Sequence, residues 1–162
     1  NAVYNETDIV LIVLDNSTTA MTGHQPHPGT GVTMMDMVKK KDTNPKGEIT
    51  HKISIEAVLK AVGVVSVEKV NPFELDKAID AVKRAAQMKG VKAIIFKSPC
   101  IAVNKPKKAY TVSEKCIKCK KCINEIGCPA VTNIDGKIEI DLSLCFGCGL
   151  CSHICPVRAI EQ

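Results

Sequence analysis

The chain contains the stretch Cys116-Ile117-Lys118-Cys119-Lys120-Lys121-Cys122, which opens the first of two cysteine runs. In full, the runs read Cys116-x2-Cys119-x2-Cys122-x5-Cys128-Pro129 and Cys145-x2-Cys148-x2-Cys151-x3-Cys155-Pro156. Three thiolates at these spacings can ligate one cubic iron–sulfur cluster, and a fourth cysteine followed by proline ligates the other cluster in bacterial two-cluster ferredoxins. The runs therefore predict two 4Fe–4S clusters with crossed ligation.

Crossed ligation assigns four cysteines from both runs to each cluster. Cluster one takes Cys116, Cys119, Cys122 and Cys155, and cluster two takes Cys145, Cys148, Cys151 and Cys128. Zinc is an alternative, because Cys-x2-Cys pairs are common zinc ligands, although zinc leaves a third closely spaced cysteine unexplained. Disulfides are a second alternative, but no apolar signal segment opens the chain, which favours a reducing cytoplasmic location.

The second part of the chain repeats itself. The first three cysteines of each run match at an offset of 29 residues, and a predicted strand at residues 137–141 links the two halves. Each half is too small to hold a hydrophobic core alone, so the clusters are expected to form much of that core. We predict a small α+β ferredoxin-like domain over residues 110–162.

Composition narrows the class of protein. The 162 residues are 45% hydrophobic and 24% charged, which is typical of a folded globular chain. No run of 18 apolar residues exists, so no membrane span is expected. The net charge of +5 lies entirely in the first 110 residues, and favours an acidic partner or a phosphorylated cofactor. Nucleic acid is disfavoured, because no basic stripe with interleaved aromatics is present.

The first part of the chain alternates strand-like and helix-like segments. Strands are predicted at 8–15, 64–70 and 91–96, and helices at 53–62 and 71–89, with an exposed excursion at 32–50. The continuous apolar run Ile9–Leu14 predicts a strand covered on both faces. This order indicates an α/β domain with a parallel sheet over residues 1–109, including a linker from about residue 98.

Ligands of parallel sheets bind at the carboxyl ends of the strands. The loop that follows the first strand, residues 15–31, is therefore the place where a site is expected. Its Asn16 side chain and a nearby backbone carbonyl are the hard oxygen donors that Mg²⁺ prefers. On spacing alone, however, a polar loop after a strand is more often only a loop.

The stretch Leu14-Asp15-Asn16-Ser17-Thr18-Thr19-Ala20-Met21-Thr22-Gly23-His24-Gln25-Pro26-His27-Pro28-Gly29, followed by Pro99-Cys100 and the two cysteine runs, carries a resemblance. In order and content the chain resembles the C-terminal part of indolepyruvate:ferredoxin oxidoreductase alpha subunits, of the thiamine-diphosphate-dependent 2-oxoacid:ferredoxin oxidoreductase family. Pyruvate-specific members typically have a second Gly where this chain has His24, so the arylpyruvate branch fits better.

The resemblance implies roles for several residues. Asn16 would give its side-chain oxygen and Thr18 its backbone carbonyl to Mg²⁺, while Thr22 and Gly23 would lie near the diphosphate of thiamine diphosphate. His24 and His27 flank this loop, and Cys100 is expected to be a buried small residue. The family's Gly-Asp-Gly element is absent here, so the chain is expected to be a fragment that is inactive alone, with no catalytic residue of its own.

The resemblance also implies the reaction and its partners. An arylpyruvate such as indolepyruvate would be oxidatively decarboxylated to an aryl-acetyl-CoA, with electrons passing through the two clusters to an external ferredoxin. Coenzyme A would be a substrate, and a beta subunit of the same enzyme would be a partner. The alternative is a dedicated two-cluster electron carrier, in which residues 1–109 form a docking domain without catalysis.

Overall fold

The computed structural model describes the chain apart from residues 20, 22, 24, 33–49, 102–103 and 105–106, so the predicted excursion at 32–50 lies almost wholly outside the described residues. The chain divides into two compact units, Asn1–Val103 and Asn104–Gln162. In the described part of the chain, the helices are too short and too polar for any of them to cross a membrane.

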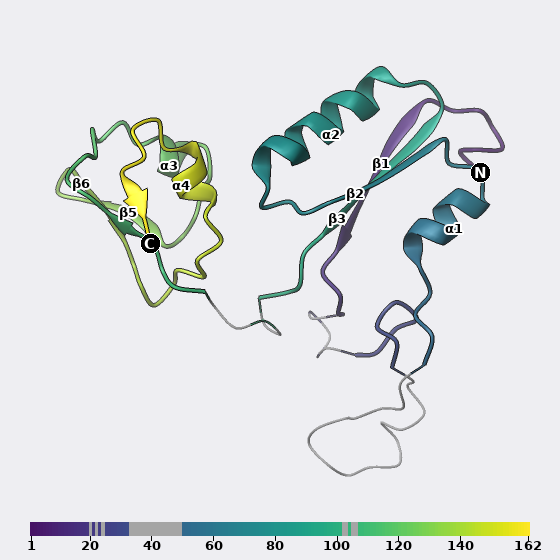
Figure 1. The fold of residues 1–162 in the computed structure, drawn as a ribbon, viewed down its shortest axis with the longest axis horizontal. Helices are drawn as coiled ribbons and strands as arrows, with labels where there is room; N and C mark the ends of the chain where they lie inside the picture. Colours follow the sequence, from purple (N-terminus) through teal and green to yellow (C-terminus); the bar gives the residue numbers. More distant parts are fainter. Residues whose placement is uncertain (20, 22, 24, 33–49, 102–103, 105–106) are drawn as a thin grey trace, which may run out of the picture. The chain divides into compact units, whose positions relative to one another are not determined.

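The first unit is built on a three-stranded parallel sheet (Figure 1). Its strands are β1 (Ile9–Asp15), β2 (Ser66–Val70) and β3 (Val91–Lys97), in the order β1-β3-β2. The register places Ile9 opposite Val91 and Asp15 opposite Lys97, so β1 and β3 end together. The predicted parallel α/β sheet is confirmed, and its carboxyl-terminal edge lies where the loop after β1 begins.

Helix α2 (Leu75–Gln87) supplies the core of the first unit. Its three buried alanines pack against β2 and β3, in a cluster made of Val70, Ala78, Ala81, Ala85 and Ile94. Helix α1 (Ile55–Ala61) is capped by Ser54, whose hydroxyl accepts a hydrogen bond from the N–H of Ala57. Both helices are shorter than predicted, and α2 begins later because the Asn71 side chain accepts the N–H of Phe73 in a turn.

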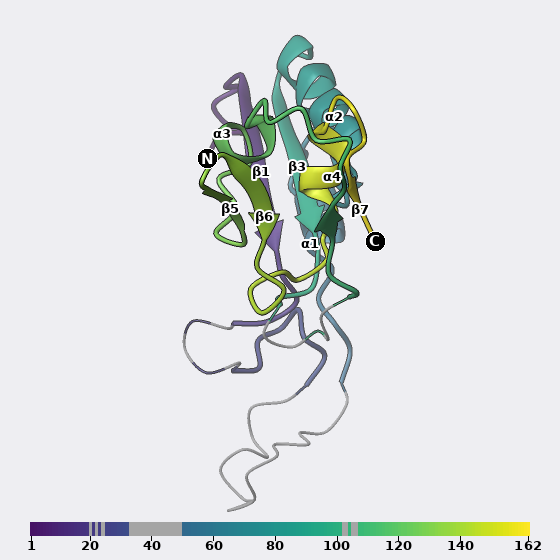
Figure 2. The same cartoon turned by 90° about the vertical axis from the view of Figure 1, so that its left-hand side faces the viewer.

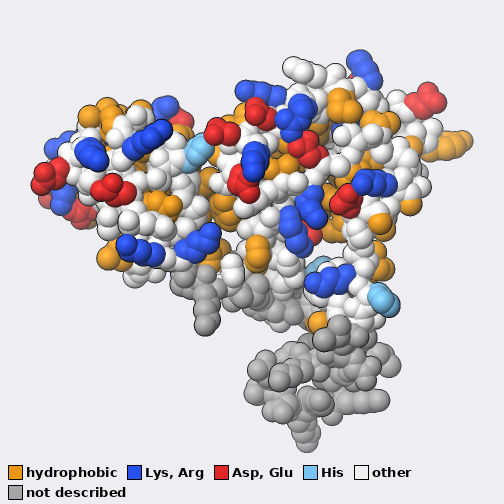
Figure 3. Space-filling model, viewed as in Figure 1, with side chains coloured by type: hydrophobic (Ala, Val, Ile, Leu, Met, Phe, Trp, Pro, Cys, Tyr) orange, Lys and Arg blue, Asp and Glu red, His pale blue; other side chains and the backbone are white. Residues whose placement is uncertain are grey.

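Strand β1 corrects the prediction of a strand buried on both faces. Its side chains are either half-buried or exposed, and Leu14 is 78% exposed. The reason is its position at the edge of the sheet, because α2 packs on β2 and β3 and, of β1, only Val10 among the described residues packs against that core. Figure 3 shows hydrophobic side chains at the surface among the charged ones.

One charged residue interrupts the apolar strand β3. Lys92 is only 2% exposed, and its ammonium group contacts the carboxylate of Asp8, the residue that precedes β1. Lys89 lies 3.2 Å from the other carboxylate oxygen. Buried charges are retained in proteins when they are paired, so this contact fixes the amino-terminal ends of β1 and β3 beside each other.

The second unit contains two small antiparallel sheets and two short helices (Figure 2). Strand β4 (Thr111–Val112) pairs with β7 (Ile160–Glu161), and β5 (Val131–Ile134) forms a hairpin with β6 (Lys137–Ile140). The helices are α3 (Lys121–Asn124) and α4 (Leu150–Ile154). The strand predicted at 137–141 is confirmed as β6, and the small α+β ferredoxin-like architecture is confirmed with it.

The core of the second unit includes cysteines. Its buried members are Cys122, Val131, Ile138, Cys151 and Ile160, and three further cysteines, Cys116, Cys128 and Cys155, pack against them. Because so few aliphatic side chains are buried, the thiols occupy positions that hydrocarbon fills in an ordinary domain.

Candidate functional site

The structure gathers the cysteines of the second unit into two groups. Cys122, on α3, lies near Cys116 and Cys119 of its own run and near Cys155 of the other run. Burial raises the pKa of the Cys122 thiol, and the negative charges of these three neighbours raise it further. The four cysteines assigned to cluster one from the sequence are therefore brought together.

The second group combines three cysteines of the second run with one cysteine of the first run. Cys151, on α4, lies near Cys148 and Cys145 of its own run and Cys128 of the first run. Burial raises the pKa of the Cys151 thiol to about 11, and the three neighbouring thiols add to this increase. The helices α3 and α4 contact each other, so each run lies close to the last cysteine of the other.

The four sulfur donors of each group suit an iron–sulfur cluster. Four thiols that repel one another as thiolates need the positive charge of bound metal to be deprotonated together. Iron–sulfur clusters take four thiolates at separate corners, whereas zinc takes all four around one ion. Among the described residues, no three His, Cys, Asp or Glu side chains are close enough to hold a single metal ion.

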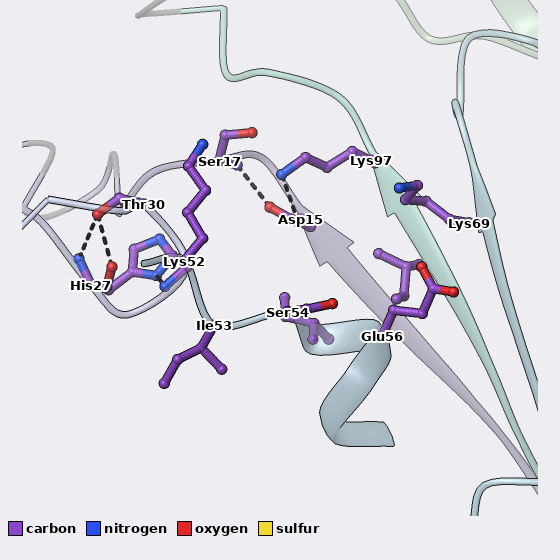
Figure 4. A pocket seen from close by; sticks show the side chains of 13 residues that line it. Asp15, Ser17, His27, Thr30, Lys52, Ile53, Ser54, Glu56, Lys69 and Lys97 are labelled. Atoms are coloured by element: carbon purple, nitrogen blue, oxygen red, sulfur yellow. Dashed lines mark hydrogen bonds and ion pairs between the residues drawn. The ribbon is translucent and has the colours of Figure 1, made fainter. Parts of the chain in front are cut away.

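The first unit has a cleft at the carboxyl ends of its strands (Figure 4). The cleft has a volume of about 370 Å³ and is bordered by the loop after β1, the start of α1 and the ends of β2 and β3. Its charged and polar side chains are Asp15, Ser17, His27, Thr30, Lys52, Ser54, Glu56, Lys69 and Lys97. The site therefore lies at the edge of the sheet where the sequence predicts it.

Asp15 anchors the loop at this edge. Partial burial raises the pKa of its carboxyl group, but hydrogen bonds from the Lys97 ammonium and the Ser17 N–H outweigh burial and leave the pKa below its ordinary value. The Ser17 N–H lies 2.9 Å and the Lys97 Nζ 2.7 Å from the carboxylate oxygens. Because Ser17 has a left-handed backbone (φ 65°), this bond holds a sharp turn directly after the strand.

Asn16 and Thr18 lie beside each other next to this turn. The Asn16 side-chain oxygen accepts the N–H of Thr18 at 3.2 Å, and its backbone carbonyl accepts the N–H of Cys100 at 2.9 Å. Asn16 is exposed and does not line the cleft. An exposed amide oxygen at a strand end is a donor of the type that Mg²⁺ takes. Cys100 is half-buried, not buried as predicted, because it follows the sheet in a surface segment.

The remaining predicted loop residues are only partly described. Thr22 and His24 lie outside the described residues. Gly23 is exposed, and a bridge between Thr19 and Gln25 brings the two sides of the loop together around it. His27 lines the cleft, and its Nδ1 accepts the N–H of Gly29 at 3.1 Å.

Sequence reasoning missed the lysines of the cleft. Lys97 and Lys69 reach it from the ends of β3 and β2, and Lys52 from the segment before α1. Lys97 could have been found, because it directly follows the strand predicted at 91–96 and so lies at the same edge as Asp15. Lys52 carries no comparable signal, since its position depends on how the chain returns from the long loop.

Comparison with known proteins places both units in described families. Residues 1–96 match the family of thiamine pyrophosphate enzymes, in its C-terminal TPP binding domain. Residues 113–131 and 138–161 each match a 4Fe-4S binding domain. The second part is also 44% identical, over 55 residues, to a pyruvate synthase subunit PorD of Methanothermobacter marburgensis, covering 34% of this chain and 64% of that protein.

The relatives that match nearly the whole chain have the same name. An indolepyruvate oxidoreductase subunit IorA of Archaeoglobus fulgidus is 42% identical over 99% of this chain, and one of Methanothermobacter marburgensis is 41% identical over 99%. In both cases the chain spans about a quarter of the relative's length, 25%. The loop after β1, the parallel sheet and the paired cysteine runs occur together in this order. The chain therefore belongs to the family of thiamine pyrophosphate enzymes, whose C-terminal TPP binding domain it matches over more than half of its length.

Proposed function

We propose that the chain is part of an enzyme that oxidatively decarboxylates arylpyruvates such as indolepyruvate. The carboxylate of the substrate leaves as CO₂, and the acyl carbon bonds to the thiol sulfur of coenzyme A, giving an aryl-acetyl-CoA. One proton and two electrons are released. The electrons leave singly through the clusters and reduce two molecules of a one-electron ferredoxin.

The first unit holds the cofactor side of this reaction. Asn16 would offer its amide oxygen and Thr18 its backbone carbonyl to Mg²⁺, and the family resemblance assigns Thr22 and Gly23 to the diphosphate. Asp15 keeps the loop in place through its bonds to Ser17 and Lys97. Thiamine diphosphate, when bound, supplies the carbanion stabilisation that decarboxylation requires. The Asp15 carboxylate beside Asn16 is held by Ser17 and Lys97, so we expect the carboxylate ligand of Mg²⁺ to come from another part of the enzyme.

The second unit holds the electron-transfer side. Cluster one is bound by Cys116, Cys119, Cys122 and Cys155, and cluster two by Cys145, Cys148, Cys151 and Cys128. The proximity of each buried cysteine, Cys122 and Cys151, to thiols of both runs supports this assignment. Two clusters that share both runs lie close together, as electron transfer over short distances requires.

The enzyme works as a complex in the cytoplasm. A beta subunit of the same enzyme completes it, and external ferredoxin accepts the electrons. The chain spans 25% of the length of these relatives. We expect the chain alone to be inactive, because the family's Gly-Asp-Gly element is not among its residues.

The observation that carries the proposal is the presence of the Asp15–Gly29 loop at the carboxyl end of β1, in one chain with two four-cysteine groups. A dedicated electron carrier has no need of Asn16 and Thr18 at a strand end.

The test uses the complete enzyme complex with both clusters assembled. Indolepyruvate and coenzyme A are added anaerobically with thiamine diphosphate and Mg²⁺, and bleaching of the cluster absorbance is followed. We expect rapid bleaching with indolepyruvate, slower bleaching with pyruvate, and none in an Asn16→Ala variant. Clusters that bleach with dithionite but not with any arylpyruvate would instead identify an electron carrier.

A further inference from the structure

The two cysteine loops differ sharply in charge although they repeat one another. The first loop carries Lys115, Lys118, Lys120 and Lys121, which we call the lysine patch. At an offset of 29 residues the second loop has Leu144, Gly147, Gly149 and Leu150. The repeat acts as an internal control, because both loops have the same cysteine spacing. The four lysines are therefore not needed to bind a cluster.

Two of these lysines occupy backbone conformations that suit glycine. Lys118 has φ 57° and Lys120 has φ 60°, and the equivalent glycines, Gly147 and Gly149, have φ 73° and 86°. Lys120 and Gly149 also hold the same place, each directly before a helix. Left-handed backbone is unfavourable for a residue with a Cβ atom, so folding alone favours glycine at all four positions. Lysine at two of them points to a role of its charge.

The two loops also differ in what covers them. A Cβ atom at Gly147 would lie 2.6 Å from the carbonyl oxygen of Lys108, and one at Gly149 would lie 3.0 Å from the hydroxyl of Tyr110. The N–H of Lys107 donates to the carbonyl of Phe146 at 3.2 Å. The segment that enters the second unit therefore lies over the loop of cluster two.

No such cover lies over the first loop within the described residues. Lys115, Lys118, Lys120 and Lys121 are all exposed, and Cys119 is the one exposed thiol among the nine cysteines. Ile117, between the lysines, is 61% exposed. An apolar side chain surrounded by charges, next to an exposed cluster ligand, is the arrangement of a docking surface for transient electron transfer.

The charge of the patch is only partly compensated. Lys121 pairs with Glu125 at 3.6 Å, and Glu114 is a second acidic neighbour in sequence. Lys115, Lys118 and Lys120 form no ion pair with any described residue. Residues 114–125 thus hold four lysines against two glutamates, a net charge of +2, whereas residues 143–154 hold no Lys, Arg, Asp or Glu.

We propose that the lysine patch, together with the exposed Ile117, is the docking surface for a small acidic iron–sulfur protein that takes electrons from cluster one. This inference rests on the proposed function, because it identifies the exit for the electrons that reaction releases. In each transfer, cluster one loses one electron and the iron–sulfur centre of the docked protein gains it. Cluster two, covered by residues 107–110, is then the inner of the two clusters.

The experiment uses the full chain with both clusters assembled and an acidic bacterial two-cluster ferredoxin as the probe. Binding is measured by calorimetry at about 50 mM and about 500 mM NaCl, since attraction between exposed charges is screened at the higher concentration. The rate of electron transfer from the dithionite-reduced chain to the ferredoxin is measured alongside. No arylpyruvate is present, so a failure of the proposed decarboxylation leaves this experiment unaffected.

Two double variants remove the same two charges in different ways. Lys118→Gly/Lys120→Gly relieves the left-handed backbone, and Lys118→Gln/Lys120→Gln keeps the Cβ atoms. Each is expected to weaken binding roughly tenfold at low salt and to differ little from the original chain at high salt. The glycine variant should unfold at the same temperature or a higher one. A Lys107→Gln/Lys108→Gln variant serves as the charge-matched control and is expected to bind normally.

Several outcomes would overturn the proposal. Equal weakening by the control pair would assign the effect to net charge, and weakening by the glycine pair alone would assign it to the backbone. Binding of the original chain to phosphatidylserine vesicles but not to ferredoxin would identify a membrane-surface site instead.

Discussion

The Asp15 carboxylate lies 2.7 Å from the Lys97 ammonium, and these two residues are also direct partners in the register of β1 and β3. The ion pair therefore joins the last residues of two neighbouring parallel strands. Asp15 is the more buried partner, with 18% of its side chain exposed against 39% for Lys97. Because the loop that carries Asn16 starts here, this pair fixes where the loop leaves the sheet.

The first prediction concerns the pH dependence of this pair. The pKa of Asp15 is lowered in the folded state from its ordinary value of 3.8, so the ionised carboxylate stabilises the fold above that value, and this stabilisation is lost as the pH falls through the lowered folded pKa. We expect Asp15→Asn to be less stable than the original chain near neutral pH, and the difference to shrink as the pH falls below about 4. Urea unfolding at a series of pH values measures this. A difference that stays constant with pH would contradict it.

The second prediction concerns the buried lysine. Asp8→Asn leaves the Lys92 ammonium without its carboxylate in a position that is only 2% exposed, so the unfolding midpoint should fall clearly. Lys89→Gln removes the other cation near Asp8, but that side chain is 95% exposed, and we expect little change. Thermal unfolding of both variants compares them. Equal effects would mean that burial of Lys92 is not what makes the contact important.

The third prediction concerns the core of the first unit. Ile94 is 1% exposed and packs under α2, so Ile94→Ala should lower the free energy of unfolding by about 2–5 kcal/mol, through lost burial and the cavity left behind. Leu14→Ala removes an equally large side chain that is 78% exposed, and we expect a change within about 0.5 kcal/mol. Urea unfolding with both clusters assembled measures the two values. A large loss from Leu14→Ala would show that β1 is covered in solution.

The fourth prediction separates crossed from uncrossed ligation. Cys116→Ser/Cys155→Ser should damage cluster one alone and leave half of the iron and acid-labile sulfide. Cys116→Ser/Cys128→Ser should damage both clusters, because Cys128 lies with the cysteines of the second run. Iron and sulfide contents, with electron paramagnetic resonance of the reduced proteins, measure this. Uncrossed ligation predicts the reverse pattern for the two variants.

The fifth prediction concerns removal of the clusters. The thiols occupy much of the core of the second unit, so extraction of iron with a chelator should unfold that unit and leave the parallel sheet folded. Hydrogen exchange measures the two units separately. The N–H of Ser113, which donates to the carbonyl of Ala159 at 2.8 Å, should lose protection from exchange, whereas the amides of β3 should keep theirs. Retained protection at Ser113 would mean that the second unit is stable without metal.

The parallel sheet could be predicted because its strands are short apolar runs separated by helical segments with clear stop signals, such as Gly90 after α2. The order β1-β3-β2 could not, since neighbouring strands leave no mark in the residues themselves. The burial of Lys92 could not be predicted for a similar reason. A lysine inside a strand is usually exposed, and only the position of Asp8 beside it makes burial tolerable.

The iron–sulfur chemistry could be predicted in more detail than the cofactor loop. Cysteine spacing constrains geometry directly, so the groups around Cys122 and Cys151 have the expected members. Asn16 and Thr18 were identified through resemblance alone, and their assignment to Mg²⁺ stays a prediction. In the sequence Lys118 and Lys120 look like ordinary surface lysines. Only their left-handed backbone conformations distinguish them from other lysines.

The uncovered strand β1 has a practical consequence for work with this chain in isolation. Within the described ranges no strand pairs with its outer edge, and the side chains of Ile9, Leu11, Ile12 and Leu14 are exposed there. An exposed apolar edge strand of this kind can pair with strands of other molecules, so the separately expressed chain is expected to precipitate at high concentration. Co-expression with the rest of the enzyme, or a charged substitution at Leu14, is the remedy that the architecture itself suggests.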